Sequence, residues 1–301
     1  MSTAASAAQP RSYLFVPGNR PERFAKALAS GADALILDLE DSVPLSEKAA
    51  ARAAVVDWLS TVRPVVPVWV RVNALGHALH EDDLQILQRV CPHGLVLPKC
   101  EGADDVLAFD EVLSALEARA GWPQRALGVM AIATETARAM QRIHTFERPL
   151  PRLSAILWGA EDLAAALGVR SLRDSQGRYL APALQARDAA LFASHACGVA
   201  AVDAVFTGLD DAPALASETR AHAALGFTAK AAIHPAQIAV IHSALQPSAD
   251  DAAWASEVII ELADGAKASG RVRGSMVDQP HLNAARRIQS AIKRVLSADK
   301  S

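Results

Sequence analysis

Short apolar runs alternate with longer helix-like segments along most of the chain, and this alternation limits the fold more than any other feature. Eight runs are typical of strands: residues 13–16, 34–37, 66–72, 94–97, 127–133, 154–158, 204–207 and 229–233. Strands separated by helices favour βαβ units and a parallel sheet. Eight such units match a (β/α)8 barrel, whose active site lies at the carboxyl ends of its strands. A doubly wound sheet is the competing fold, but we find no glycine-rich phosphate turn after the first strand.

Helix signals occur between the runs and change beyond residue 245. Pro21 suits the first turn of a helix, and Ser46 suits the N-cap of a helix that reaches residue 59. Residues 171–179 are polar and predict a loop, whereas 182–198 predict a long helix. Near the C-terminus we expect a linker at 247–251, a helix at 252–267, a loop at 271–282 and a basic helix at 284–296. We therefore predict a disordered tail at 1–10, a TIM barrel at 11–246 and a lid or oligomer contact at 247–301.

The composition gives no sign of a nucleic-acid or membrane partner. The chain of 301 residues has 30 basic and 33 acidic residues, a formal net charge of −3, so it offers no electrostatic argument for binding a polyanion or an anionic bilayer. We see no apolar run long enough to span a bilayer and no signal peptide in the first nine residues. Three cysteines without metal or redox spacing indicate a reducing compartment. We expect a cytoplasmic protein.

Two acids follow neighbouring strands of the predicted barrel. Glu135 follows the fifth run, and Asp162 follows the sixth within the segment 157–162. Because parallel strands end at one mouth, the two side chains should converge there. Cysteine-free oxygen ligands of this kind suit Mg²⁺. Either acid alone is explained as well by a helix N-terminus, where the macrodipole stabilises a carboxylate, so the metal hypothesis depends on the pair.

Basic side chains stand at the same predicted rim. Arg71 follows the third run, where a guanidinium beside a metal could stabilise an enolate oxygen, or could form a buried ion pair with Asp38 or Glu40. Arg20 and Lys26 could hold phosphates, or they could be ordinary solvated charges. A purely structural network of rim salt bridges remains the alternative for the whole set.

The combined motifs resemble the citrate lyase β-subunit / malyl-CoA lyase family, of the HpcH/HpaI aldolase/citrate lyase type. The resemblance runs from about Arg11 to the C-terminal tail, and each motif alone would be weak. The motifs are RSYLFVPGNRPERF at 11–24, GADALILDLED at 31–41, VRVN at 70–73, LPK at 97–99, ETA at 135–137, GAED at 159–162 and AIHP at 232–235.

The resemblance implies a trimeric or hexameric TIM barrel with Mg²⁺ on Glu135 and Asp162. It also implies that Arg71 contacts the reacting carbonyl and that Glu40 lies beside the waters of the metal site. Residues matching Arg20 and Lys26 lie where the phosphates of coenzyme A (CoA) are held. The segment 274–281 is similar to a C-terminal lid that reaches a neighbouring subunit, which makes Asp278 the candidate acid/base. Without the resemblance, Asp278 fits a turn residue equally well.

The expected reaction is Mg²⁺-dependent cleavage of a 3-hydroxyacyl-CoA, of the citryl-, malyl- or citramalyl-CoA type, to acetyl-CoA or a related acyl-CoA plus a 2-oxo acid. Three alternatives remain open. A malyl-CoA thioesterase would release free CoA thiol, and a CoA-independent, metal-dependent hydroxy-oxo-acid aldolase would turn over a free acid. A non-catalytic assembly subunit would be inert and would not bind Mg²⁺.

Overall fold

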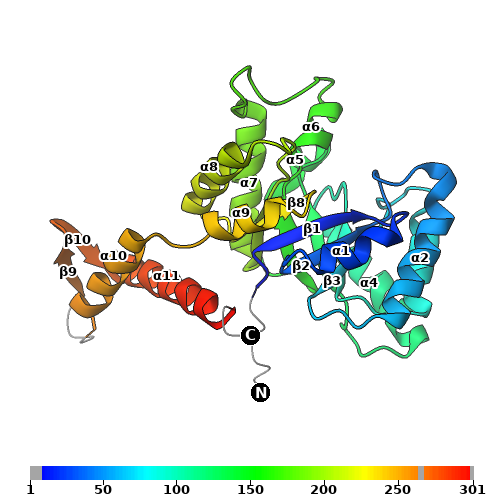
Figure 1. Cartoon of the computed structure of the whole chain (residues 1–301), viewed down its shortest axis with the longest axis horizontal. Helices are drawn as coiled ribbons and strands as arrows, with labels where there is room; N and C mark the ends of the chain where they lie inside the picture. Colours follow the sequence, from blue (N-terminus) through cyan, green and yellow to red (C-terminus); the bar gives the residue numbers. More distant parts are fainter. Residues whose placement is uncertain (1–8, 264–267, 299–301) are drawn as a thin grey trace. The chain divides into compact units, whose positions relative to one another are not determined.

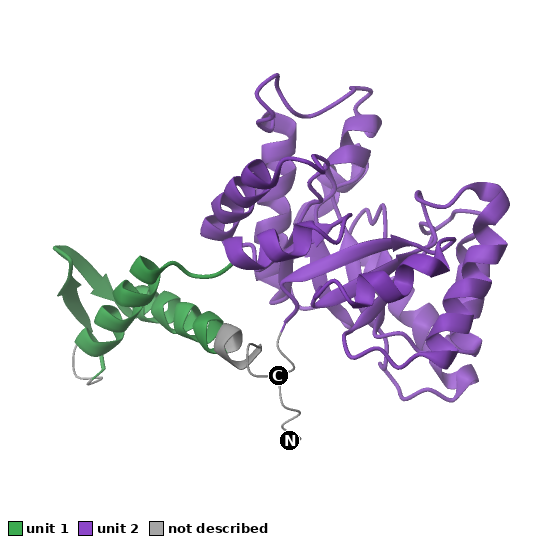
Figure 2. Cartoon of the chain, in the orientation of Figure 1, with its two compact units in different colours: residues 1–8, 245–301 green, residues 9–244 purple. Residues whose placement is uncertain are grey.

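The computed structural model describes residues 9–263 and 268–298, and these form two compact units, one of residues 9–244 and one of the described residues from 245 onward (Figures 1 and 2). Most of the tail that we expected to be disordered, residues 1–8, lies outside the described residues. In the larger unit eight parallel strands close into a barrel in chain order. The predicted (β/α)8 barrel is therefore confirmed.

The barrel strands pair in sequence, and the last pairs with the first. Leu14 lies opposite Leu35 of the second strand and Ala232 of the eighth, which closes the ring. The strands are β1 (Ser12–Pro17), β2 (Ala34–Asp38), β3 (Val68–Arg71), β4 (Gly94–Leu97), β5 (Gly128–Ile132), β6 (Leu153–Leu157), β7 (Ala200–Asp203) and β8 (Ala229–Ala232).

Helices connect the strands, and several carry the signals expected from the sequence. Pro21 opens η1, and Gly198 in a left-handed conformation ends α7. The helical elements of this unit are η1 (Pro21–Arg23), α1 (Phe24–Leu28), η2 (Leu45–Glu47), α2 (Lys48–Thr61), α3 (His80–Leu84), η3 (Gln85–Gln88), α4 (Ala103–Ala120), α5 (Ala137–Arg142), η4 (Ile143–Thr145), α6 (Ala160–Ala166), α7 (Ala181–Cys197), α8 (Ala212–Leu225) and α9 (Gln237–Ala244).

Apolar side chains from all eight strands fill the barrel, and Trp69 is the largest of them. Its indole lies against β4 and β5, where both facing residues are glycines. A Cβ on Gly94 would come within 2.3 Å of the Trp69 ring, and one on Gly128 within 3.0 Å. These glycines therefore make room for the indole, and the packed interior leaves the strand ends as the place for chemistry.

The position predicted for the seventh strand was wrong. We expected it at 204–207, but β7 ends at Asp203, which lies opposite Lys230 of β8. A carboxylate usually marks the edge of an apolar run, so the sequence favours a strand that begins after Asp203. In the barrel the carboxylate of Asp203 is buried and paired with Lys230, so the strand ends with this residue. Asp203 therefore stands at the strand end, and Thr207 lies beyond it.

The smaller unit is more regular than predicted. Ser248 and Asp251 form a capping box that starts α10 (Ala249–Glu261), so the expected linker at 247–251 is mostly helix. The end of the predicted helix, residues 264–267, lies outside the described residues. The loop predicted at 271–282 is a hairpin of β9 (Ser269–Val272) and β10 (Ser275–Asp278), followed by α11 (Gln279–Ala298). Arg273 and Gly274 both have positive φ, as a two-residue hairpin turn requires.

Candidate active site

The carboxyl ends of β3, β5 and β6 meet at one small cavity of about 70 Å³. Arg71, Glu135 and Asp162 all line it, together with Phe15 of β1 and the start of α6. Parallel strands of a barrel point the same way, so residues distant in sequence arrive at a shared mouth. The structure thus brings the two predicted metal ligands and the predicted carbonyl-binding arginine together.

Arg71 is held by two carboxylates from the end of β2. Its Nε and Nη2 each donate to Asp38 at 2.7 Å, and its Nη1 lies 3.1 Å from Oε2 of Glu40. The guanidinium also lies over the ring of Phe15, at 5.0 Å from the centroid. Burial opposes ionisation of Asp38, but the Arg71 guanidinium outweighs it and lowers the pKa of that carboxyl. The ion pair of Arg71 with Asp38 and Glu40, which the sequence offered as one role of this arginine, is present and fixes the guanidinium in the mouth.

Glu40 is buried beside two cations. Lys99 donates to its Oε1, and its Oε2 forms the ion pair with Nη1 of Arg71. Burial raises the pKa of Glu40 even though Arg71 and Lys99 lower it. A buried carboxylate whose pKa is raised is suited to accept a proton.

Glu135 lies at the bottom of the mouth and is only 3% exposed. The backbone N–H of Lys99 donates to its Oε2 at 2.5 Å. Gly159 makes space for it, because a Cβ on Gly159 would lie 2.7 Å from Glu135 Cγ. Burial, with the negative charges of Asp162 and Glu40, raises the pKa of Glu135 to about 8.

These groups fit a hard divalent cation. The mouth holds more acid than base: the carboxylates are those of Asp38, Glu40, Asp41, Glu135 and Asp162, and the cations are those of Arg71 and Lys99. Burial, together with the negative charges of Asp162 and Glu40, raises the pKa of Glu135, so a cation beside this carboxyl would stabilise its ionised form. Oxygen donors short of countercharge are what Mg²⁺ requires. The fit therefore depends on the electrostatics of Glu135 as well as on residue type.

Lys48 supports the mouth from below and was missed by the sequence reasoning. Its buried ammonium donates to the carbonyl oxygens of Leu39 and Glu40 at 2.6 and 2.7 Å, and to Asn73 Oδ1 at 3.2 Å. Asn73 in turn donates from Nδ2 to Asp83 at 2.5 Å. The network fixes the turn that carries Glu40. A lysine at the start of a helix gives no sequence signal for this role.

A groove continues from the mouth between β1 and the end of β8. A cavity of about 270 Å³ is lined by Arg71 and Arg23, and one of about 370 Å³ by Arg23, Lys26 and His234. The structure thus places Lys26 in the groove and adds Arg23, which the sequence reasoning had passed over. Arg20 is exposed and lines neither cavity.

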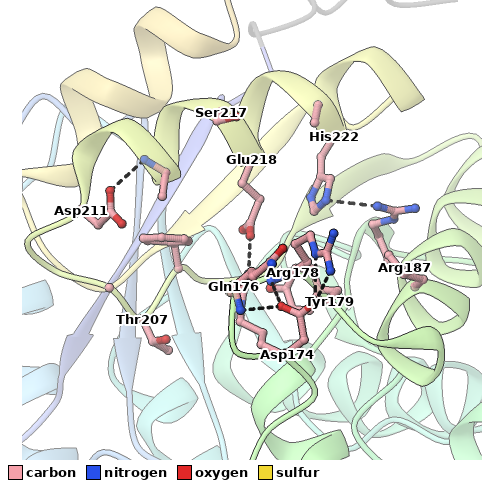
Figure 3. Close-up of a pocket in the computed structure, with 17 residues that line it drawn as sticks. Asp174, Gln176, Arg178, Tyr179, Arg187, Thr207, Asp211, Ser217, Glu218 and His222 are labelled. Atoms are coloured by element: carbon pink, nitrogen blue, oxygen red, sulfur yellow. Dashed lines mark hydrogen bonds and ion pairs between the residues drawn. The ribbon is translucent and has the colours of Figure 1, made fainter.

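A larger cavity, of about 800 Å³, lies beside α8 and the loop at 171–179 (Figure 3). Glu218 and His222 project from α8 toward it. Nη1 of Arg173 donates a hydrogen bond of 2.7 Å to Oε2 of Glu218. Polar atoms of Glu218, His222 and the buried Asp203 lie close enough together to hold a metal ion.

The ammonium of Lys230 already fills that cluster. It lies 2.6 Å from Asp203 Oδ2 and 3.1 Å from Glu218 Oε1, and His222 Nδ1 lies 2.9 Å from the same Asp203 oxygen. Burial opposes ionisation of Asp203, but Lys230 and His222 outweigh it and lower the pKa of that carboxyl. We therefore interpret the cluster as a structural ion pair.

Asp278, the predicted acid/base, is the last residue of β10 in the smaller unit. Its Oδ1 lies 2.6 Å from Nδ1 of His281 in the first turn of α11, and its side chain is 35% exposed. The carboxylate is therefore accessible and held in one orientation by its own hairpin and helix.

The chain matches the HpcH/HpaI aldolase/citrate lyase family model over residues 11–235. It is 38% identical over 276 residues to a citrate lyase subunit beta-like protein of Mycobacterium tuberculosis, covering 91% of this chain and 92% of that protein. It is 31% identical to the mitochondrial citramalyl-CoA lyase of Homo sapiens, covering 91% of this chain and 83% of that enzyme.

A solved structure also matches along nearly the whole chain. CitE of M. tuberculosis, in complex with magnesium, acetoacetate and coenzyme A, superposes with a TM-score of 0.81 at 36% identity, covering 95% of this chain and 98% of that one. In the described part of this chain, no helix is both long and apolar enough to cross a bilayer. Together the matches confirm the resemblance seen in the motifs: the chain belongs to the HpcH/HpaI aldolase/citrate lyase family.

Proposed function

We propose that this protein is a Mg²⁺-dependent carbon–carbon lyase that cleaves a 3-hydroxyacyl-CoA to acetyl-CoA, or a related acyl-CoA, and a 2-oxo acid. The observation that carries the proposal is the single cavity shared by Glu135, Asp162 and Arg71. The relatives of this chain support a CoA-thioester lyase, since they include a citramalyl-CoA lyase and a CitE that is solved in complex with magnesium and coenzyme A.

Glu135 and Asp162 would hold the cation, which when bound supplies Lewis-acid polarisation of the substrate. Glu40, with its raised pKa, would accept the proton of the substrate hydroxyl. The carbon–carbon bond then breaks, and its electron pair forms the thioester enolate while the hydroxyl carbon becomes the carbonyl of the 2-oxo acid. Arg71, fixed by Asp38, would stabilise the enolate oxygen.

Asp278 would return a proton to the enolate carbon and so complete the acyl-CoA product. We propose that it acts in the mouth of a second copy of the chain, within a homotrimer or homohexamer. Its partial exposure and its contact with His281 support a carboxyl that is oriented yet accessible. The reverse condensation would use the same groups in the opposite order.

Lys26 and Arg23 would hold the phosphates of CoA in the groove beside the mouth. Two cations along one cavity suit a ligand with several anionic groups. The groove meets the mouth at Arg71, which also lines the cavity of about 270 Å³. A thioester extending from the groove would thus reach the guanidinium.

Release of acetyl-CoA from malyl-, citramalyl- and citryl-CoA, measured with Mg²⁺ and with EDTA, tests the proposal. We expect Mg²⁺-dependent release of a 2-oxo acid in equal amount, and none from Glu135→Gln or Asp162→Asn in folded protein. Free CoA thiol in place of acetyl-CoA would indicate a thioesterase. Turnover of a free hydroxy-oxo acid, without binding of a CoA thioester, would indicate the aldolase instead.

A further inference from the structure

Lys99, the second residue after β4, contacts four carboxylates of the mouth. Its backbone N–H donates to Glu135 at 2.5 Å, and its ammonium donates to Glu40. The same ammonium lies 3.2 Å from Asp41 Oδ2 and 3.5 Å from Asp162 Oδ1. Burial alone would lower the pKa of Lys99, but Glu40, Asp162 and Glu135 raise it, so the ammonium stays charged.

The backbone of Lys99 is held in an unfavourable conformation. Its φ is 50°, in the left-handed region that residues with a Cβ rarely occupy. Such conformations persist where the surroundings impose them, and they concentrate at functional sites. In this conformation the N–H of Lys99 points to Glu135 and its side chain points to Glu40 and Asp162. One residue therefore contacts both proposed metal ligands and the proposed base.

The ammonium of Lys99 and a divalent cation would compete for the carboxylate of Asp162. Asp162 is a proposed metal ligand, and its Oδ1 is already within ion-pair distance of Lys99. A fixed positive charge a few ångströms from a dication repels it, and this repulsion is substantial in a partly buried site. The carboxylate pair without this lysine would therefore bind the metal more tightly than the protein does.

We propose that Lys99 is a positioning residue that assembles the carboxylates of the mouth and, by competing for Asp162, weakens the binding of Mg²⁺. The inference rests on the proposed function, because it takes Glu135 and Asp162 as the metal ligands. The ammonium of Lys99 reduces the electrostatic repulsion between Glu40 and Asp162, and the same positive charge lowers the affinity of the site for the cation.

Isothermal titration with MgCl₂ in the absence of substrate tests this inference. Lys99→Met keeps the apolar stem and removes the charge, and we expect it to tighten Mg²⁺ binding on the order of ten-fold. Lys99→Arg keeps the charge and should stay within about three-fold of wild type. Lys26→Met removes a charge from the groove instead of the mouth, and it should leave the affinity near that of wild type.

The direction of the change separates this inference from a general structural role. A residue that only supports the fold would weaken Mg²⁺ binding when it is replaced, so unchanged or weaker binding by folded Lys99→Met overturns the inference. Lys99→Gln is a second neutral variant in case methionine disturbs folding. Wild-type protein that binds no Mg²⁺ would overturn the proposed function as well, which distinguishes the two failures.

Discussion

The indole N–H of Trp158 donates a hydrogen bond of 2.7 Å to Oδ1 of Asp203. Asp203 also accepts from the ammonium of Lys230, so the buried ion pair between β7 and β8 reaches the end of β6. The residues after Trp158 start α6 and carry Asp162. The start of the helix that carries a proposed metal ligand is thus fixed by a network outside the metal site.

Removal of Lys230 should destabilise the whole barrel. Lys230→Met leaves the buried carboxylate of Asp203 without its ammonium partner, and breaking a buried pair in this way costs about 3–5 kcal/mol. Urea unfolding followed by circular dichroism measures the change. Arg178→Met, which removes only an exposed ion pair to Asp174, is the control and should keep the wild-type midpoint. Equal midpoints for the two variants would show that the buried pair contributes little.

Binding of Mg²⁺ should tighten as the pH rises toward about 8. The pKa of Glu135 is raised to about 8, and only its ionised form can ligate, so below that pH the cation must displace a proton. Because a ligand stabilises the folded state more as its affinity rises, the increase in melting temperature caused by Mg²⁺ should grow from pH 6 to pH 8 and then level off. Titrations in two buffers of different ionisation enthalpy should detect proton release at pH 7. A pH-independent affinity over this range would contradict the assignment of Glu135.

Lys26→Met should raise KM for a CoA thioester with a smaller effect on kcat. Its side chain lines the groove, where a lost phosphate contact weakens binding of the ground state and the transition state alike. We expect an increase in KM of about ten-fold, from the loss of one charge-assisted contact. Arg20→Met is the matched variant outside the groove, and it should change KM less. The opposite order would return the phosphate-binding role to Arg20.

Asp278→Asn should reduce kcat by roughly 10²–10⁴ while leaving Mg²⁺ affinity unchanged, because general acid catalysis typically contributes that factor. Steady-state kinetics with the best thioester substrate measures it. Mixing Asp278→Asn with the inactive Glu135→Gln tests whether the carboxyl acts on a second copy. Activity regained in mixed oligomers supports this arrangement, and a near-normal rate of the single variant would return Asp278 to the role of a turn residue.

The barrel and the main members of its site were predictable because they depend on local sequence order. Apolar runs between helices define parallel strands. Because parallel strands of a barrel end at the same mouth, they bring Arg71, Glu135 and Asp162 together whatever the length of the connecting segments. The hairpin in the smaller unit was missed although Arg273–Gly274 carries a turn signal, because the polar strands beside it lack an apolar pattern.

Only the tertiary structure decided which charges meet. Lys99 is bonded to Glu40 across 59 positions of the sequence, and Asp203 to Lys230 across 27. No periodicity connects such pairs, since their proximity arises from the side-by-side arrangement of strands in the barrel. The sequence by itself determined the order of the strands and the residues at their ends. Burial and the charges that the barrel brings together raise the pKa of Glu135 and fix the orientation of Arg71, because those properties depend on neighbours that are distant along the chain.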